Sequence, residues 1–195
     1  MRRIEPVEMM RRDRTAAAIH RAALQMTDEF GFDGWTMDHL AERVGVSRRT
    51  LFNHVPSKMD AVLGPDHEPD PELGATFVGG GPTGHVGRDL GVLVRTVLEA
   101  EKMDHDDLVL IRRVLKTDKQ VLDAAHARFE KATAHFAEVI SQREGDQMTP
   151  ELAGVALRLV IVVFDAALDA YLANPSAGTV ADHFTRIFDD LVDLF

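Results

Sequence analysis

The chain has 195 residues, 45% of them hydrophobic and 28% charged, with a net charge of −10; these values are typical of a globular protein with a substantial core. It contains no cysteine, which excludes a disulfide-stapled fold, a thiolate metal site and a cysteine nucleophile. The first ten residues lack the apolar segment of a signal peptide, and Arg158 and Asp165 interrupt the longest apolar stretch, so we expect a cytoplasmic protein without a membrane span.

The N-terminal part carries the pattern of four helices. Apolar side chains recur at spacings of three and four from residue 11 to residue 30, which predicts an amphipathic helix that ends at Gly31. Thr36 is a candidate N-cap for a short second helix, and Gly45 breaks the chain after it. Ser47 can cap a third helix that extends to about residue 54, and Ser57 can cap a fourth.

Residues 64–87 contain half of the 14 glycines and half of the 8 prolines of the chain. Because both residue types disfavour helix interiors, we predict a long loop without a helix of useful length. Leu73, Phe77 and Val78 are the residues of this segment that we expect to anchor it to the body of the protein.

The rest of the chain returns to a helical period, and no segment alternates as a strand does. We predict helices over residues 90–98, 108–115, 121–140, 150–171 and 179–194. The expected fold is therefore all-α. We expect two domains, one at residues 1–57 with three helices and a helical bundle at residues 58–195.

Residues 36–58 are the most informative segment. Two short helices joined by a tight glycine turn, with small Ala41 where they cross, have the geometry of a helix-turn-helix, whose second helix enters the DNA major groove. Its exposed positions hold side chains suited to nucleic acid: Arg48, Arg49, Thr50, Asn53 and His54. Arginine pairs with guanine and asparagine with adenine in that groove, whereas threonine and histidine suit phosphate contacts.

The run VGVSRRTLFNHVPSKMDAV, residues 44–62, resembles the TetR family of bacterial repressors, and so does the preceding GFDGWTMDHLAERVGVS. The resemblance covers about the first 60 residues. It implies phosphate contacts by Thr36, Thr50, His54 and Lys58 and base contacts by Arg48, Arg49 and Asn53. The family commonly has tyrosine at Phe52 and phenylalanine at Val55; since a phenyl ring has no hydroxyl for a phosphate, we assign Phe52 to packing only, and Val55 likewise.

The charge distribution agrees with a local DNA-binding surface. Residues 1–60 hold 10 Lys/Arg and 9 Asp/Glu, a net of +1, whereas residues 61–195 hold 12 and 23, a net of −11. A basic region can bind phosphates while an acidic body points away. Two alternatives remain open: the charges only solvate the surface, or residues 36–58 form a structural helical hairpin without a DNA role.

The segment after Pro150 is apolar nearly all round, which predicts a helix buried on all sides. Together with the Phe184–Phe188–Leu191 face of the last helix, it is predicted to form a homodimer interface through the two C-terminal helices. The alternative is a central core helix of a monomer. A dimer suits the palindromic operators that helix-turn-helix proteins read, whose half-sites lie about 34 Å apart.

The family resemblance also implies that residues 1–57 are a helix-turn-helix DNA-binding domain and that residues 58–195 serve effector binding and dimerisation. It implies a repressor whose operator affinity is reduced by a small-molecule effector, with the fourth helix linking the two domains. The residues that we expect to line its apolar cavity are Met103, Leu110, Val114, Phe129, Phe136 and Phe164.

Two other classes of protein, an enzyme and a helical interaction protein, fit the sequence less well. An enzyme would use Asp165 and Asp169, which lie four residues apart, but no Glu-x-x-His pair, P-loop, His-Glu-x-x-His or Gly-x-Ser-x-Gly motif accompanies them. A helical interaction protein would have no need for the Arg48–Arg49 pair. We therefore predict a DNA-binding regulator with no catalytic residues, no metal and no cofactor.

Overall fold

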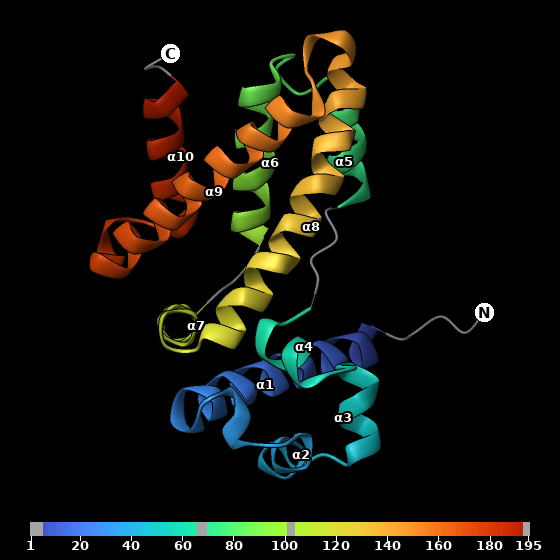
Figure 1. Ribbon diagram of the computed structural model, residues 1–195, viewed down its shortest axis with the longest axis vertical. Coiled ribbons are helices and arrows are strands. Elements are labelled where there is room, and N and C mark those ends of the chain that lie inside the picture. The colour runs from blue at the N-terminus through green and yellow to red at the C-terminus, as the bar shows by residue number, and fades with distance from the viewer. Residues whose placement is uncertain (1–5, 66–69, 101–103, 193–195) are drawn as a thin grey trace, which may run out of the picture. The chain divides into compact units, whose positions relative to one another are not determined.

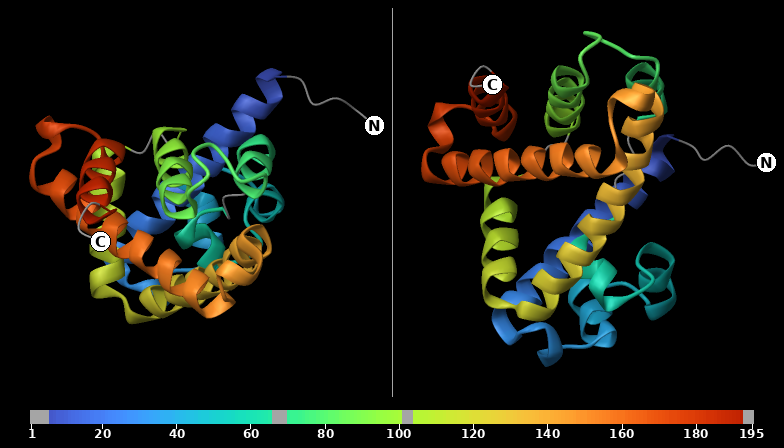
Figure 2. Two further views of the ribbon diagram at one scale, coloured as in Figure 1. Left: turned by 90° about the horizontal axis from the view of Figure 1, so that it is seen from above. Right: turned by 45° about the horizontal axis from the view of Figure 1, so that its top comes forward.

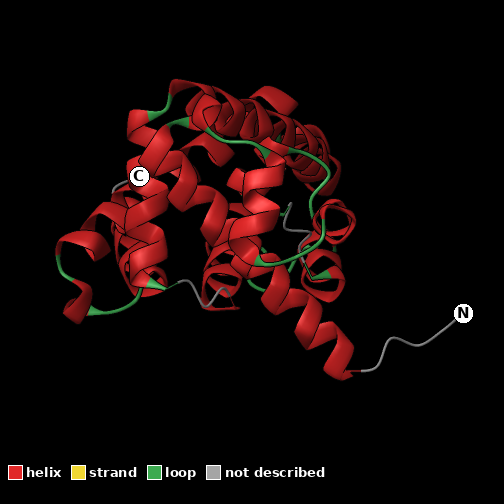
Figure 3. Ribbon diagram, turned by 90° about the horizontal axis from the view of Figure 1, so that it is seen from below, coloured by secondary structure: helices red, strands yellow, loops and turns green. Residues whose placement is uncertain are grey.

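The computed structural model describes residues 6–65, 70–100 and 104–192, which form helices joined by loops and contain no strand (Figure 3). The predicted all-α fold is confirmed. The chain divides into two compact units: unit 1 combines residues 1–67 with residues 106–127, and unit 2 combines residues 68–105 with residues 128–195. Unit 1 thus includes a later segment that the predicted division after residue 57 places in the second domain.

Unit 1 contains the four N-terminal helices and a later helix pair (Figure 1). The elements are α1 (Pro6–Phe30), the 3-10 turn η1 (Phe32–Gly34), α2 (Met37–Val44), α3 (Arg48–His54), α4 (Lys58–Leu63), α7 (His105–Thr117) and the start of α8 (Lys119–Glu144). The predicted caps are present, because Ser57 accepts a hydrogen bond from the Asp60 N–H at the start of α4. His20 on α1 hydrogen-bonds the Ala61 carbonyl of α4 at 3.0 Å, which ties these two helices together.

The core of unit 1 is built from both of its chain segments. Val114 of α7 and Val121 of α8 are each 1% exposed and belong to the same buried cluster as the apolar face of α1. Two ion pairs at the surface join α1 to α7, Arg21 to Asp107 at 2.5 Å and Arg113 to Asp28 at 2.9 Å. The N-terminal helices therefore do not form their core alone, since α7 and α8 cover part of it.

Unit 2 consists of α5 (Pro71–Val78), α6 (Val86–Ala100), the end of α8, α9 (Pro150–Ala173) and α10 (Val180–Val192). α10 packs against both α9 and α6 (Figure 2). The approach to α6 is close at Gly91, where a Cβ atom would lie 2.5 Å from Cε1 of Phe188. Any larger residue at position 91 would therefore push the Phe188 ring out of the core.

One prediction about unit 2 is wrong, because residues 64–87 are not a helix-free loop. Asp70 accepts hydrogen bonds from the N–H groups of Glu72 and Leu73, and Pro71 occupies the first turn, where its missing N–H costs nothing. The local N-cap and the burial of Phe77, which is 5% exposed, outweigh the glycine content of the segment. Phe77 thus anchors α5 as expected, whereas Val78 is 53% exposed and does not.

The expected role of the last helix also needs correction. Phe184 is 0% and Phe188 is 8% exposed within a single chain, and their rings stack at 5.4 Å in the core of unit 2. This face of α10 packs against α6 and α9, so Phe184 and Phe188 are not available to an interface between chains. The helix after Pro150, in turn, is not buried on all sides, since Leu152, Val155, Leu159 and Val162 are 49–65% exposed.

A buried charge pair organises one end of unit 2. Asp89 of α6 is 0% exposed and accepts hydrogen bonds from the N–H and hydroxyl of Thr83, both at 2.7 Å, and from the guanidinium of Arg143 of α8, which is 2% exposed. The Arg143 guanidinium also lies 4.5 Å from the Phe77 ring centre, and its Nε lies 2.9 Å from Glu144. Burial raises the pKa of Asp89, but the hydrogen bonds from Thr83 and Arg143 outweigh that effect and hold the pKa below its ordinary value.

We predict that Asp89→Asn lowers the free energy of unfolding by about 3–5 kcal/mol at neutral pH, because it removes the buried carboxylate that pairs with the Arg143 guanidinium and leaves that cation only its ion pair with Glu144 among the residues described. Since the pKa of Asp89 is lowered on folding, the stabilisation is present above the unfolded-state pKa of about 3.9 and is lost as the pH falls through the folded-state pKa. Urea unfolding followed by circular dichroism measures both effects. Asp189→Asn, at an exposed position of α10, is the control; equal stability of the two variants would contradict the prediction.

Candidate nucleic-acid interface

The segment from Thr36 to His54 forms two helices joined by a tight turn. The Thr36 hydroxyl accepts the His39 N–H at 3.3 Å and starts α2. Gly45 ends α2 in the left-handed conformation, with φ of 74°, which a residue with a Cβ adopts only at a cost. Ser47 then caps α3 by accepting the Thr50 N–H at 3.0 Å. The predicted helix-turn-helix is therefore present, with its caps and its glycine where the sequence placed them.

The inner faces of both helices are in the core of unit 1. Leu40 and Leu51 are 0% exposed, Ala41 at the helix crossing is 6% exposed, and Val55 after α3 is 9% exposed. These are the packing positions that the sequence predicts. Because one face of α3 is fixed against this core, its opposite face has a defined orientation toward solvent.

That outer face carries the predicted base-reading residues. Arg48, Arg49 and Asn53 are exposed, while Thr50 and His54 are half-buried at the edges of the helix. Arg49 and Asn53 form no hydrogen bond or ion pair with any residue that the structure describes, so their donors face solvent. The Thr50 hydroxyl hydrogen-bonds that of Ser47 at 2.7 Å.

Arg48 differs from its neighbour because two side chains hold it. Its Nη1 lies 3.2 Å from Oδ2 of Asp38 on α2, and its guanidinium lies 5.6 Å from the ring centre of Phe52, one turn later on α3. Phe52 is 41% exposed. The prediction that it serves packing only is thus incomplete, because the ring contributes to the solvent-facing surface beside Arg48.

Lys58 lies in an aromatic setting that the sequence did not indicate. Its ammonium donates a hydrogen bond to the Trp35 carbonyl and lies 4.3 Å from the Trp35 ring centre and 4.7 Å from that of Phe32. Desolvation lowers the pKa of Lys58, and the nearby carboxylates of Asp33 and Asp118 act against that shift. The side chain therefore joins the start of α4 to the residues that precede α2.

The η1 turn before α2 is also held by the junction of α7 and α8. Asp118 accepts the Phe32 N–H at 2.8 Å, and the Gln120 side chain donates to Asp33 at 2.6 Å. Sequence reasoning missed these residues. Asp118 accepts the N–H groups of Gln120 and Val121 and so caps α8, which an N-cap pattern can reveal, but its bond to a residue 86 positions earlier is visible only in the fold.

The residues predicted to line an effector cavity are divided between the two units. Leu110 and Val114 of α7 pack in the core of unit 1. Three lie half-buried in unit 2, on α8 and α9: Phe129, Phe136 and Phe164. Met103 lies outside the described residues. The structure therefore does not bring these residues together within one unit.

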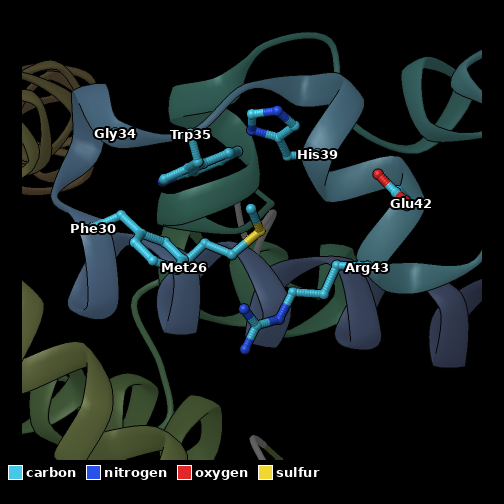
Figure 4. Close-up of a pocket in the computed structure, with 7 residues that line it drawn as sticks. All are labelled: Met26, Phe30, Gly34, Trp35, His39, Glu42 and Arg43. Atoms are coloured by element: carbon cyan, nitrogen blue, oxygen red, sulfur yellow. The ribbon is translucent and has the colours of Figure 1, made fainter.

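A surface depression of about 450 Å³ lies elsewhere, between α1, η1 and α2 of unit 1 (Figure 4). Its lining residues are Met26, Phe30, Gly34, Trp35, His39, Glu42 and Arg43. In the close-up the Met26 side chain lies beneath the Trp35 ring, and His39 and Arg43 project from α2. Arg43 forms a bidentate ion pair with Glu29, with N–O distances of 3.0 and 3.1 Å. The depression is open and includes none of the predicted DNA contacts.

Within the described ranges, no three His, Asp or Glu side chains are grouped so that they could hold a metal ion. None of the helices described is both long and apolar enough to cross a membrane.

Residues 19–62 match the family model described as bacterial regulatory proteins of the tetR family. This segment extends from the middle of α1 to α4 and contains the whole helix-turn-helix. The match covers 44 of the 195 residues, so the likeness to the TetR family is shown for this segment. No match to the chain exists among the curated proteins.

Solved structures show that the likeness of fold extends over most of the chain. NalD from Pseudomonas aeruginosa, the secondary repressor of the MexAB-OprM multidrug efflux pump, is 19% identical, with 93% of this chain and 95% of NalD covered and a TM-score of 0.56. A second structure of NalD gives 20% identity, coverage of 92% and 96%, and a TM-score of 0.55. A Mesorhizobium loti protein described as a TetR-family transcriptional regulator is 17% identical, with 94% and 98% covered and a TM-score of 0.50. At these identities the likeness shows the fold alone.

We predict that Lys58→Met lowers the free energy of unfolding by about 1–2 kcal/mol, because it removes a desolvated cation–π contact and a hydrogen bond. Trp35 is the single tryptophan of the chain and is 2% exposed, so its fluorescence reports the affected site directly. Urea titration of the wild type and the variant measures the difference. Lys119→Met, which removes an 83% exposed ammonium from unit 1, is the control. Equal midpoints for Lys58→Met and the control would show that Lys58 does not hold the Trp35 segment.

Proposed function

We propose that the chain is a ligand-responsive repressor that binds a palindromic operator as a homodimer in the cytoplasm. The observation that carries the DNA-binding part is the outer face of α3, where Arg48, Arg49 and Asn53 project to solvent from a helix fixed by its buried opposite face. An α-helix fits the major groove, and these side chains match the donor and acceptor pattern of guanine and adenine there.

The phosphate contacts are proposed at the edges of α3. The Thr36 hydroxyl accepts the His39 N–H and so keeps its own proton for a phosphate oxygen. Thr50 and His54, which lie four residues apart and half-buried along the same edge of α3, complete this set. Lys58 is proposed to act through Trp35 and thereby to support Thr36, since its ammonium is already engaged by the Trp35 carbonyl and two rings.

The homodimer is proposed to form along α9. Its exposed apolar residues Leu152, Val155, Leu159 and Val162 follow spacings of three, four and three, which is the pattern of a coiled-coil seam. A contiguous exposed apolar stripe is unusual on a monomer and marks an interaction site. The same stripe on a second copy is self-complementary across a two-fold axis, and two joined helix-turn-helix units suit a palindromic site.

Ligand response is proposed for unit 2, because its helical bundle is separate from the helix-turn-helix and α8 runs from one unit into the other. NalD, which shares the fold, is a repressor of a multidrug efflux pump, and this supports repression as the direction of control. An effector that binds more tightly to a conformation with weak DNA affinity would release the operator by its difference in affinity.

The DNA-binding proposal is tested by fluorescence anisotropy with the best duplex selected from a randomised pool. We expect tight, salt-dependent binding by the wild type. Replacement of both Arg48 and Arg49 by alanine should cost about 2–6 kcal/mol, since each removes one paired contact to a base.

Arg88→Ala/Arg95→Ala removes the same charge from exposed positions of α6 and serves as the control. Failure of the pool to yield any duplex that binds better than random DNA would contradict the proposal. So would equal affinities for the two double variants.

The dimer proposal is tested by sedimentation of Val155→Glu/Leu159→Glu. Two carboxylates in the centre of the apolar stripe should convert a wild-type dimer to a monomer, because charge buried in an interface is costly without a partner. Val78→Glu, which changes a 53% exposed valine on α5, should leave the dimer intact. A wild-type chain that sediments as a monomer, or a double variant that stays dimeric, would exclude α9 as the interface.

A further inference from the structure

The two arginines at the start of α3 have different surroundings. Arg49 is exposed and forms no contact with a charged or aromatic side chain in the described part of the chain. Arg48 is held between the Asp38 carboxylate of α2, at 3.2 Å, and the Phe52 ring, at 5.6 Å. The two arginines therefore do not present equivalent guanidinium groups to a ligand.

The Asp38–Arg48 contact is not a significant source of stability. Both side chains are largely exposed, at 62% and 67%, and ion pairs between exposed groups contribute little because water screens them. What the contact does is restrict the guanidinium, whose long side chain otherwise samples many rotamers. Only Nη1 is engaged by Asp38, so Nη2 and Nε remain free to donate two parallel hydrogen bonds.

Phe52 supports the same arrangement from the other side. It lies four residues after Arg48, hence on the same face of α3, and its ring is 41% exposed. A phenyl ring offers no hydrogen bond to a phosphate, but its face attracts a guanidinium. The ring on α3 and the carboxylate on α2 thus both restrain the Arg48 guanidinium.

We propose that Asp38 and Phe52 are positioning residues that determine specificity: they orient Arg48 for two hydrogen bonds to one guanine in the major groove of each half-site. This inference rests on the proposed DNA-binding function and names the base and the residues that select it. These two contacts favour one orientation of Arg48, whereas Arg49 has no such restraint among the residues described.

Asp38 is also expected to affect DNA affinity, which a residue with a purely structural role would not do. Its negative charge lies beside the surface that faces the phosphates, so it weakens binding to DNA of any sequence. Asp38 therefore lowers the affinity for DNA of any sequence and raises the discrimination between bases at one position. Removal of the charge should move these two quantities in opposite directions.

The test compares the wild type, Asp38→Asn, Phe52→Leu and Glu42→Gln. Glu42 is exposed on α2 one turn after Asp38 and is not in contact with Arg48, so its variant removes the same charge without releasing the guanidinium. Each protein is titrated against the selected duplex, against the duplexes with each base replaced in turn, and against random-sequence DNA, with Trp35 fluorescence as a check of folding.

For Asp38→Asn we expect discrimination to fall about 10-fold or more at a single guanine of each half-site, while affinity for random DNA rises. Phe52→Leu should lose discrimination at that same guanine. Glu42→Gln should raise affinity for random DNA and keep wild-type discrimination. Wild-type discrimination in Asp38→Asn, or a loss spread evenly over all positions, would overturn the inference. A wild type without sequence preference would instead overturn the proposed function itself.

Discussion

The burial of Trp35 is the constraint on which the proposed DNA-binding surface depends. Its indole N–H donates to the Thr27 hydroxyl at 3.1 Å, and that hydroxyl in turn donates to the Ala23 carbonyl of α1 at 2.8 Å. The ring is thereby fixed to α1, and the next residue, Thr36, is the N-cap at which α2 begins. Because Gly45 and Ser47 define the turn to α3, the position of the recognition helix follows from the position of Trp35. Lys58 completes the arrangement from α4.

Charge is distributed so that it serves different purposes in the two units. In unit 1 the ion pairs of the surface are exposed and contribute little energy, but one of them, at Arg48, lies where it can orient a base contact. In unit 2 the Asp89–Arg143 pair is fully buried, and replacing only one of its two charged side chains would lower the free energy of unfolding. The acidic excess of residues 61–195 leaves the helix-turn-helix as the region suited to a polyanion.

The local features of the fold and site were predictable from the sequence, because they depend on neighbours in the chain. Caps at Thr36 and Ser47, and the left-handed glycine at position 45, involve residues at most a few positions apart. Features that depend on distant segments were not predictable. The contacts of Lys58 with Phe32 and of Asp118 with the same turn join residues 26 and 86 positions apart. For α10, periodicity identified the apolar face correctly but could not tell whether α6 and α9 or a second chain covers it.

Methylation interference on a selected duplex tests most directly whether α3 enters the major groove. Methylation of guanine N7 blocks the major-groove edge, whereas methylation of adenine N3 blocks the minor groove. We expect binding to be abolished by N7 methylation at two sets of guanines about one helical turn apart and to tolerate N3 methylation between them. Binding that tolerates N7 methylation throughout, or that depends only on adenine N3, would contradict the placement of α3 in the major groove.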